Sequence, residues 1–164
     1  MDPSKYWANR LVRKSVLAGA AQGEPGDVRT AACSALWAFS ACDLIQKRMW
    51  DDERVRETLL SCAAAKIHTS AEAAPRPQSE DVRSLAFRCL AFLATESLNR
   101  EEMWRTRRLS AVALQTMYVG GALRAEALKV VVELTKCYGN IDSMEEAGVV
   151  NLLKAAAEDE SLDP

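Results

Sequence analysis

Apolar residues recur every three or four positions along most of the chain, which is the spacing that places them on one face of an α-helix. Two segments show it most clearly, with apolar residues at Val28, Ala32, Ala35, Leu36 and Phe39 in the first and at Val82, Ala86, Cys89, Leu90 and Leu93 in the second. Asp27 and Asp81 stand just before these segments, and aspartate is a favoured N-cap residue. Both segments are therefore predicted to be amphipathic helices.

Strand signals are scarce, because the sequence has no run of alternating β-branched residues and no Asn-Gly or Asp-Gly turn. Alanine, leucine, arginine, glutamate and methionine dominate, and all five favour helices. The pattern predicts an all-α chain with helices at residues 4–9, 11–21, 27–41, 44–50, 53–67, 80–96, 100–105, 107–118, 121–137, 141–147 and 149–158.

The chain also repeats itself. Residues 27–50 and 81–104 are identical at eight of 24 positions, and both segments end in Met-Trp. Residues 122–134 form a third copy, which aligns with residues 81–93. The start of the chain around Trp7 resembles the segment around Trp50. A recurring unit of a short, a medium and a longer helix is typical of helical solenoids, whose units must stack to bury their apolar faces. We therefore predict a right-handed α-α superhelix, and we expect Val28, Val82 and Leu123 to occupy equivalent places in its core.

The predicted domain covers residues 1–164, with three to four repeats at residues 4–41, 44–96, 99–137 and 140–158. Residues 66–80 interrupt the period with two prolines among Ser, Ala and Glu, and we interpret them as an inserted surface loop. The last repeat stops after its second helix. We expect the chain to be a piece of a longer array, the alternative being that this helix pair is a terminal cap.

The last repeat, "NIDSMEEAGVVNLLKAA", is similar to an armadillo repeat, with Gly148 at the bend where a side chain would clash between two steeply crossing helices. The Asp-Val-Arg starts of the long helices resemble HEAT repeats. That resemblance implies that Arg29, Arg83 and Arg124 pair with aspartates of neighbouring units. It also implies that the long helices line a concave, peptide-binding groove.

The armadillo groove positions that commonly hold Trp and Asn are occupied here by Ser34 and Ala38, by Arg88 and Phe92, and by Lys129 and Glu133. Recognition of basic nuclear-import signals is therefore not expected. Aromatic anchors and cations instead suit an apolar or acidic peptide or partner domain. The predicted groove residues are Trp37, Arg88, Phe92, Lys129 and Glu133, with Lys129 and Glu133 paired on their own helix. The alternative interpretation is that Trp37 and Phe92 are core residues, as we expect Trp7, Trp50 and Trp104 to be.

Basic residues recur at the starts of the medium helices, and stacking would bring them into a basic stripe of Arg10, Arg13, Lys14, Arg54, Arg56, Arg105, Arg107 and Arg108. Such a stripe is the alternative binding surface, for nucleic acid or an anionic lipid. Asp51, Asp52 and Glu53 interleave with it, and the net charge of −2 gives no general attraction to polyanions. A solvated face of mixed charge is the competing interpretation, and we do not expect nucleic acid as the partner.

Catalysis receives little support. The single histidine, His68, falls in the proline-containing loop, and no phosphate-binding, dinucleotide, zinc-protease or hydrolase motif occurs. The five cysteines form no CxxC pair and lie in helical contexts, so most are expected to be buried apolar residues in a reducing compartment.

We predict a non-enzymatic interaction scaffold or adaptor without cofactor or metal. The start of the chain has no signal-peptide pattern, and no apolar run is long enough to span a membrane, which favours a cytoplasmic or nuclear location.

Overall fold

The computed structural model describes residues 3–64 and 77–158, and this part of the chain is helical without strands. It contains eleven α-helices and one short 3-10 helix. Their bounds are α1 Pro3–Ala8, α2 Arg10–Gly19, α3 Gly26–Ser40, α4 Asp43–Asp51, α5 Glu53–Ala63, α6 Pro77–Thr95, α7 Ser97–Arg105, α8 Arg107–Val119, α9 Arg124–Thr135, η1 Tyr138–Asn140, α10 Ile141–Glu146 and α11 Val149–Ala157. The prediction of an all-α chain is confirmed.

Each helix predicted from the apolar spacing overlaps one α-helix of the structure, and the differences lie at the ends. Helix α6 begins at Pro77, so residues 77–80 of the predicted loop are helical, and the rest of that loop lies outside the described residues. Helix α7 begins at Ser97 because the side chain of Glu96 caps it by accepting a hydrogen bond from the backbone N–H of Leu98. Helix α9 begins only at Arg124, after a turn in which Gly120 and Gly121 both have φ of 78°.

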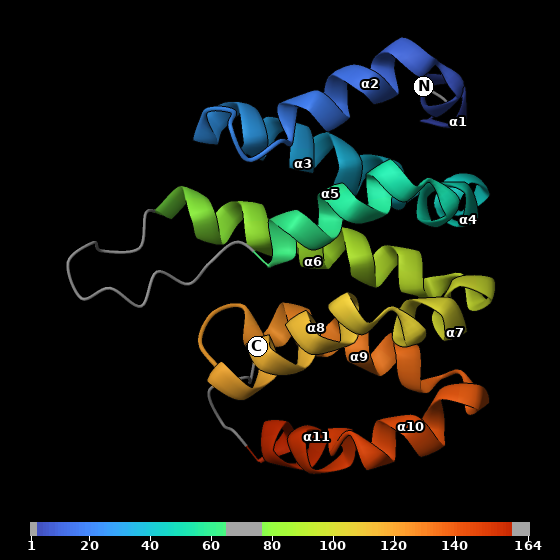
Figure 1. Cartoon of the computed structure of the whole chain (residues 1–164), viewed down its shortest axis with the longest axis vertical. Helices are drawn as coiled ribbons and strands as arrows, with labels where there is room; N and C mark the ends of the chain where they lie inside the picture. Colours follow the sequence, from blue (N-terminus) through green and yellow to red (C-terminus); the bar gives the residue numbers. More distant parts are fainter. Residues whose placement is uncertain (1–2, 65–76, 159–164) are drawn as a thin grey trace.

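Helices α1 to α9 follow one another in three groups of three, η1, α10 and α11 form a last group, and each group packs against the next (Figure 1). The long helices α3, α6 and α9 contact one another in that order and make the most extensive contacts in the molecule. The medium helices α2, α5 and α8 each pack on the long helix of their own group. The short helices α1, α4 and α7 lie together at one side, to the right in Figure 1. We call each group a layer.

The three repeated tryptophans, Trp7, Trp50 and Trp104, are buried in the core as predicted. Large side chains of every described layer join them, with Leu36, Leu60, Phe87, Leu90 and Leu109 among those fully buried. The expected equivalence of three core positions is wrong in one case. Val82 and Leu123 are buried, but Val28 is 40% exposed. Val28 lies on α3, and within the described residues no earlier long helix packs against α3, whereas α6 lies between two long helices.

Gly148 lies at the bend between α10 and α11 as predicted, but the predicted steric reason is wrong. A Cβ atom added at this glycine would meet no heavy atom within 4 Å. Its backbone has φ of 76° and ψ of 16°, the left-handed conformation that favours glycine. Backbone conformation, not crowding between the helices, is therefore the reason for glycine at this position.

Three buried amide side chains tie the layers together, and we call them the amide ladder: Gln46, Asn99 and Asn140. Each stands near the start of a short helix and donates to the backbone carbonyl six residues earlier, at the end of the preceding long helix. The pairs are Gln46 Nε2 with Ser40 O at 3.0 Å, Asn99 Nδ2 with Leu93 O at 2.9 Å, and Asn140 Nδ2 with Leu134 O at 3.0 Å. These bonds satisfy carbonyls that a helix end leaves without a partner.

Two members of the amide ladder make a second hydrogen bond to the layer before. Asn99 Nδ2 lies 3.4 Å from the backbone oxygen of Gln46 in the layer before, and Asn140 Nδ2 lies 3.1 Å from the backbone oxygen of Arg100. Asn140 stands 41 residues after Asn99, the same offset that relates residues 122–134 to residues 81–93. The structure adds the reason for the match, because both amides bridge two layers in the same way.

Candidate functional site

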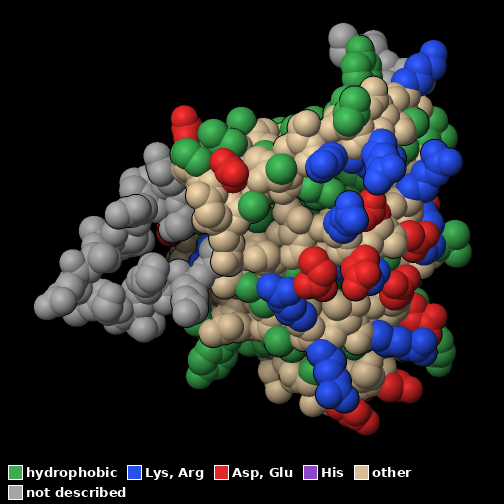
Figure 2. Space-filling model, turned by 45° about the horizontal axis from the view of Figure 1, so that its top comes forward, with side chains coloured by type: hydrophobic (Ala, Val, Ile, Leu, Met, Phe, Trp, Pro, Cys, Tyr) green, Lys and Arg blue, Asp and Glu red, His purple; other side chains and the backbone are tan. Residues whose placement is uncertain are grey.

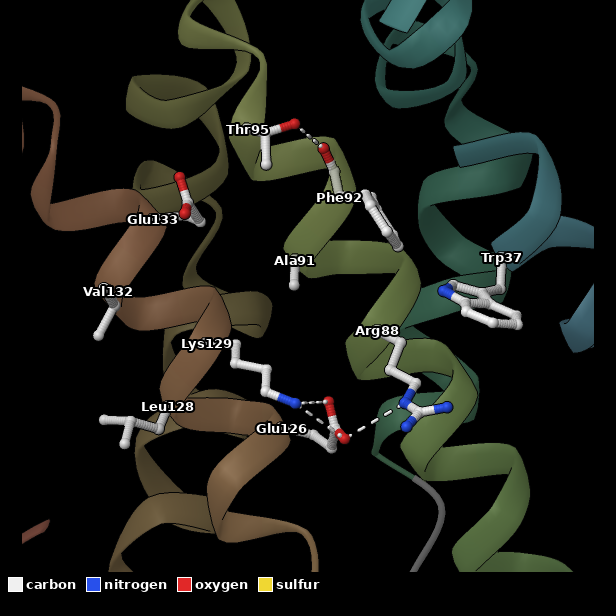
Figure 3. Close-up of a pocket in the computed structure, with 10 residues that line it drawn as sticks. All are labelled: Trp37, Arg88, Ala91, Phe92, Thr95, Glu126, Leu128, Lys129, Val132 and Glu133. Carbon is white, nitrogen blue, oxygen red and sulfur yellow. Dashed lines mark hydrogen bonds and ion pairs between the residues drawn. The ribbon is translucent and has the colours of Figure 1, made fainter. Parts of the chain in front are cut away.

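A cavity of about 640 Å³ lies over the long helices α3, α6 and α9 (Figure 3). It is lined by Trp37, Arg88, Ala91, Phe92, Thr95, Glu126, Leu128, Lys129, Val132 and Glu133. All five groove residues predicted from the sequence are among them, although they come from three helices up to 96 positions apart in the chain. We call this cavity the groove.

Helical spacing explains how two of the helices present their residues to the groove. Residues 88, 91, 92 and 95 of α6 are three or four positions apart and share one face of that helix. Residues 128, 129, 132 and 133 of α9 share a face in the same way. Trp37 is contributed by α3 from the neighbouring layer. The groove is thus a product of stacking, since no single layer contains it.

The apolar residues of the groove are partly accessible. Phe92, which projects from α6 toward α3, is 36% exposed, and Val132, which projects from the side of α9 turned away from α6, is 41% exposed (Figure 3). Ala91, Leu128 and Trp37 are half-buried. Phe92 is not among the fully buried core residues, whereas Phe87 on the same helix is fully buried, and the assignment of Phe92 to the groove stays a prediction. Trp37 is half-buried, which is compatible both with a groove residue and with a core residue.

The cations of the groove are organised by Glu126, which the sequence interpretation missed. Arg88 Nε lies 3.2 Å from Oε1 of Glu126, and Lys129 Nζ lies 3.2 Å from Oε2 and 3.3 Å from Oε1 (Figure 3). The guanidinium of Arg88 also lies over the ring of Trp37, 5.6 Å from its centroid. The predicted pair of Lys129 with Glu133 is wrong, because the largely buried carboxylate of Glu126, one turn earlier on α9, takes Lys129. The spacing of three residues between Glu126 and Lys129 was the available signal.

Glu133, at the other end of the groove, has cations of its own. Its carboxylate lies 2.6 Å from Lys136 Nζ and 3.7 Å from Arg100 Nη2. Arg100 also donates to the backbone carbonyls of Ala94 and Thr95, both at 2.9 Å, and so binds the end of α6. Arg100 therefore joins the last turn of α6 to α9 beside the groove.

Some residues of the predicted basic stripe contact tryptophans of the core, and others pair with glutamates. Arg13 donates to the backbone oxygen of Trp7 at 2.7 Å and lies over its ring, and Arg56 does the same with Trp50 at 3.2 Å. Both arginines are therefore largely structural. Two more stripe residues pair with glutamates, Arg105 with Glu101 at 2.5 Å and Arg108 with Glu57 at 2.6 Å.

The remaining stripe residues, Arg10, Lys14, Arg54 and Arg107, are exposed. Figure 2 shows basic and acidic side chains interspersed over the face that it presents. A smaller cavity of about 350 Å³ lies between the first two layers, lined by Trp7, Ala8, Arg13, Arg48 and Asp52. Because Asp52 lines this cavity together with the two arginines, its charge is mixed as well.

Arg83, one of the three HEAT-like arginines, makes different contacts from those that the resemblance implies. Arg83 donates from Nε to the backbone oxygen of Ala63 at 3.0 Å and from Nη2 to Thr116 Oγ1 at 3.4 Å. It therefore links α5 of its own layer to α8 of the next, without an aspartate. The charge of Arg29 acts on the thiol of Cys62.

Three of the five cysteines, Cys33, Cys62 and Cys89, are buried as predicted, and Cys42 and Cys137 are half-buried. The Cys33 thiol donates to Cys62 Sγ at 3.7 Å. This hydrogen bond raises the pKa of Cys33 and lowers that of Cys62 to about 7, with burial opposing the latter and Arg29 assisting it. Burial raises the pKa of Cys89 to about 12. Residues 3–64 and 77–158 hold no group of three or more His, Cys, Asp or Glu side chains suited to a metal ion, and His68 lies outside this part.

The fold and the groove define, over residues 3–64 and 77–158, a helical protein of packed layers with a partly apolar, charge-lined cavity on its long helices. None of the described helices has the length and apolar character needed to cross a membrane. Comparison with models of known protein families, with curated proteins and with solved structures gives no significant match.

Proposed function

We propose that this protein is a non-enzymatic interaction module of the armadillo or HEAT-like type, which binds a peptide or a partner domain in the groove. In this proposal the layers are repeats of a right-handed α-α superhelix, and the groove is its concave face. Support comes from the order in which long helices contact long helices and short helices contact short ones. A stack of repeats offers a rigid surface, so little ordering cost accompanies binding.

The observation that carries the proposal is the composition of the groove. Phe92 and Val132 expose apolar surface on its two sides, and charged residues stand at both ends (Figure 3). Partially exposed aromatic side chains surrounded by polar groups are typical of binding hot spots. A cavity with apolar lining residues and a few placed polar groups is also the usual form of a ligand site.

A panning experiment tests the proposal. A library of random peptides displayed on phage is selected on the wild-type protein, and the affinity of each enriched peptide is measured by fluorescence polarisation. We expect Phe92→Asp to weaken these peptides at least tenfold, because it replaces an apolar side chain of the groove with a charge. Leu11→Asp, which makes the same change at an exposed position on α2, is the matched control and is expected to leave affinity unchanged.

Circular dichroism and thermal melting of both variants separate loss of binding from loss of folding. If the enriched peptides bind Phe92→Asp as tightly as wild type, the groove is not the binding surface and the proposal fails. If Phe92→Asp unfolds the protein, Phe92 supports the core and the proposed role of Phe92 as a contact residue is wrong.

The second candidate function is binding of nucleic acid or anionic lipid through the basic stripe. The exposed residues Arg10, Lys14, Arg54 and Arg107 favour it, and the structural contacts of Arg13 and Arg56 count against it. Such binding would weaken steeply as salt rises, because cations on the protein replace the counterions of the polyanion. Titration of RNA, DNA and anionic vesicles at 50 and 200 mM salt tests this candidate, and binding that is absent or insensitive to salt removes it.

A further inference from the structure

The charged groups of the groove that reach solvent are basic, although acidic residues line it in equal number. The side chains of Arg88 and Lys129 are 45% and 60% exposed, whereas those of Glu126 and Glu133 are 12% and 20% exposed. Glu126 is far less exposed than the two cations that it pairs with, and Glu133 pairs with Arg100 and Lys136. A ligand entering the groove therefore meets positive charge first.

One carboxylate serves two cations at the lower end of Figure 3. Glu126 accepts from Arg88 through a single guanidinium nitrogen, Nε, and it accepts from Lys129 through Nζ. The contact with the ring of Trp37 holds the guanidinium of Arg88 in place without neutralising its charge. One positive charge at this end is therefore left without a balancing carboxylate within the groove.

We propose that the groove binds a peptide segment whose aspartate or glutamate carboxylate contacts Arg88 and Lys129 in competition with Glu126, while a neighbouring large apolar side chain packs on Phe92. This inference rests on the proposed function and specifies its ligand. Glu126 acts as an internal substitute for the carboxylate of the ligand. Arginine is suited to this exchange, because its planar guanidinium binds carboxylates with two parallel hydrogen bonds.

The dimensions of the groove limit the recognised sequence to a few residues. The groove-lining part of α6 runs from Arg88 to Thr95, and seven residues of helix span roughly 10 Å. An extended peptide covers that distance in about three residues, at roughly 3.3 Å each. The acidic residue at Arg88 and the apolar residue at Phe92 are therefore expected to be adjacent or two positions apart in the ligand.

The experiment uses the peptides enriched on the wild-type protein and, for each, a version in which every Asp and Glu is replaced by Asn and Gln. We expect the enriched sequences to pair a large apolar residue with an Asp or Glu, and the amide versions to lose at least tenfold in affinity. The same acidic peptides are then titrated against three protein variants at one fixed salt concentration.

The first variant, Arg88→Gln/Glu126→Gln/Lys129→Gln, removes both cations without leaving a buried carboxylate unpaired. It is expected to weaken the acidic peptides at least tenfold. Arg54→Gln on the exposed part of α5 lowers the net charge by the same one unit and is expected to have no effect. Glu126→Gln alone removes the competing carboxylate, so it is expected to tighten binding several-fold.

Each outcome decides between the inference and the function on which it rests. The inference is overturned if the enriched peptides are basic or if their amide versions bind equally well. It is also overturned if Glu126→Gln weakens the binding of acidic peptides or leaves it unchanged. In each of these cases peptide binding in the groove still stands. If no enriched peptide is sensitive to Phe92→Asp, the proposed function fails and the inference fails with it.

Discussion

The guanidinium of Arg88 lies over the indole ring of Trp37, 5.6 Å from the ring centroid, and joins α6 of the second layer to α3 of the first. Arg13 over Trp7 and Arg56 over Trp50 repeat this contact, but each of these arginines also donates to the backbone oxygen of its tryptophan. Arg88 instead uses Nε for Glu126 at the groove. The same pair of residue types is thus bonded to the backbone at Trp7 and Trp50, whereas at Trp37 the arginine is partly exposed and lines the groove.

The two phenylalanines of α6 offer a matched test of core against groove. Phe87→Ala is expected to lower the free energy of unfolding by about 3–5 kcal/mol, because Phe87 is fully buried and its loss leaves a cavity. Phe92→Ala is expected to cost about 1 kcal/mol or less, since this side chain is already partly in water. Urea denaturation of both variants measures the difference, and equal losses would contradict the distinction.

The amide ladder is expected to contribute strongly to stability. Asn99→Ala leaves the carbonyls of Leu93 and Gln46 without their donor in the core, which we expect to cost about 2–3 kcal/mol in the free energy of unfolding. Leu98→Ala, one residue earlier and exposed, is the control, with an expected change within about 0.5 kcal/mol. If Asn99→Ala changed the free energy of unfolding as little as Leu98→Ala, water would have replaced these hydrogen bonds.

The bend between α10 and α11 depends on the conformational freedom of Gly148. Gly148→Ala is expected to destabilise the protein by about 1–2 kcal/mol, because its left-handed backbone is unfavourable for a residue with a Cβ. Gly23→Ala is the matched control, since Gly23 has neither a positive φ nor a neighbour within 4 Å of an added Cβ. It is expected to be neutral or slightly stabilising, and thermal melting of the two variants distinguishes them.

The Cys33–Cys62 pair predicts a particular dependence of stability on pH. The pKa of Cys62 is lowered from an ordinary 9.0 to about 7 by the hydrogen bond from Cys33, so between pH 7 and 9 the unfolded chain retains a proton that the folded protein has lost. The free energy of unfolding should therefore rise with pH over this range. Above pH 9 the raised pKa of Cys33 and Cys89 reverses the trend, because the unfolded thiols then lose protons that the folded ones keep.

Urea denaturation from pH 6.5 to 10 under reducing conditions measures this profile. Cys33→Ala removes the thiol that donates to Cys62, and in that variant the rise between pH 7 and 9 is expected to disappear. The interpretation is wrong if Cys33→Ala and wild type show the same rise.

The helices were predictable from the sequence because they depend on local periodicity. The groove positions came from the resemblance to armadillo repeats, which implied that residues 88 and 92 of one long helix face the same groove as residues 129 and 133 of the next, and all four line one cavity of the structure. Glu126 was missed because its role depends on Arg88, which reaches it from another layer. The exposure of Val28 was missed for a similar reason, since burial depends on whether a neighbouring layer covers the residue.

Arg100 links α6 to α9 beside the groove. This side chain fastens the carbonyls at the end of α6 while it holds Glu133 of α9, and its own backbone oxygen is bonded by Asn140. The width between the two helices is therefore set before any ligand arrives. Peptides would then be sorted by fit to a preformed spacing, and related ligands are expected to differ mainly in how slowly they leave.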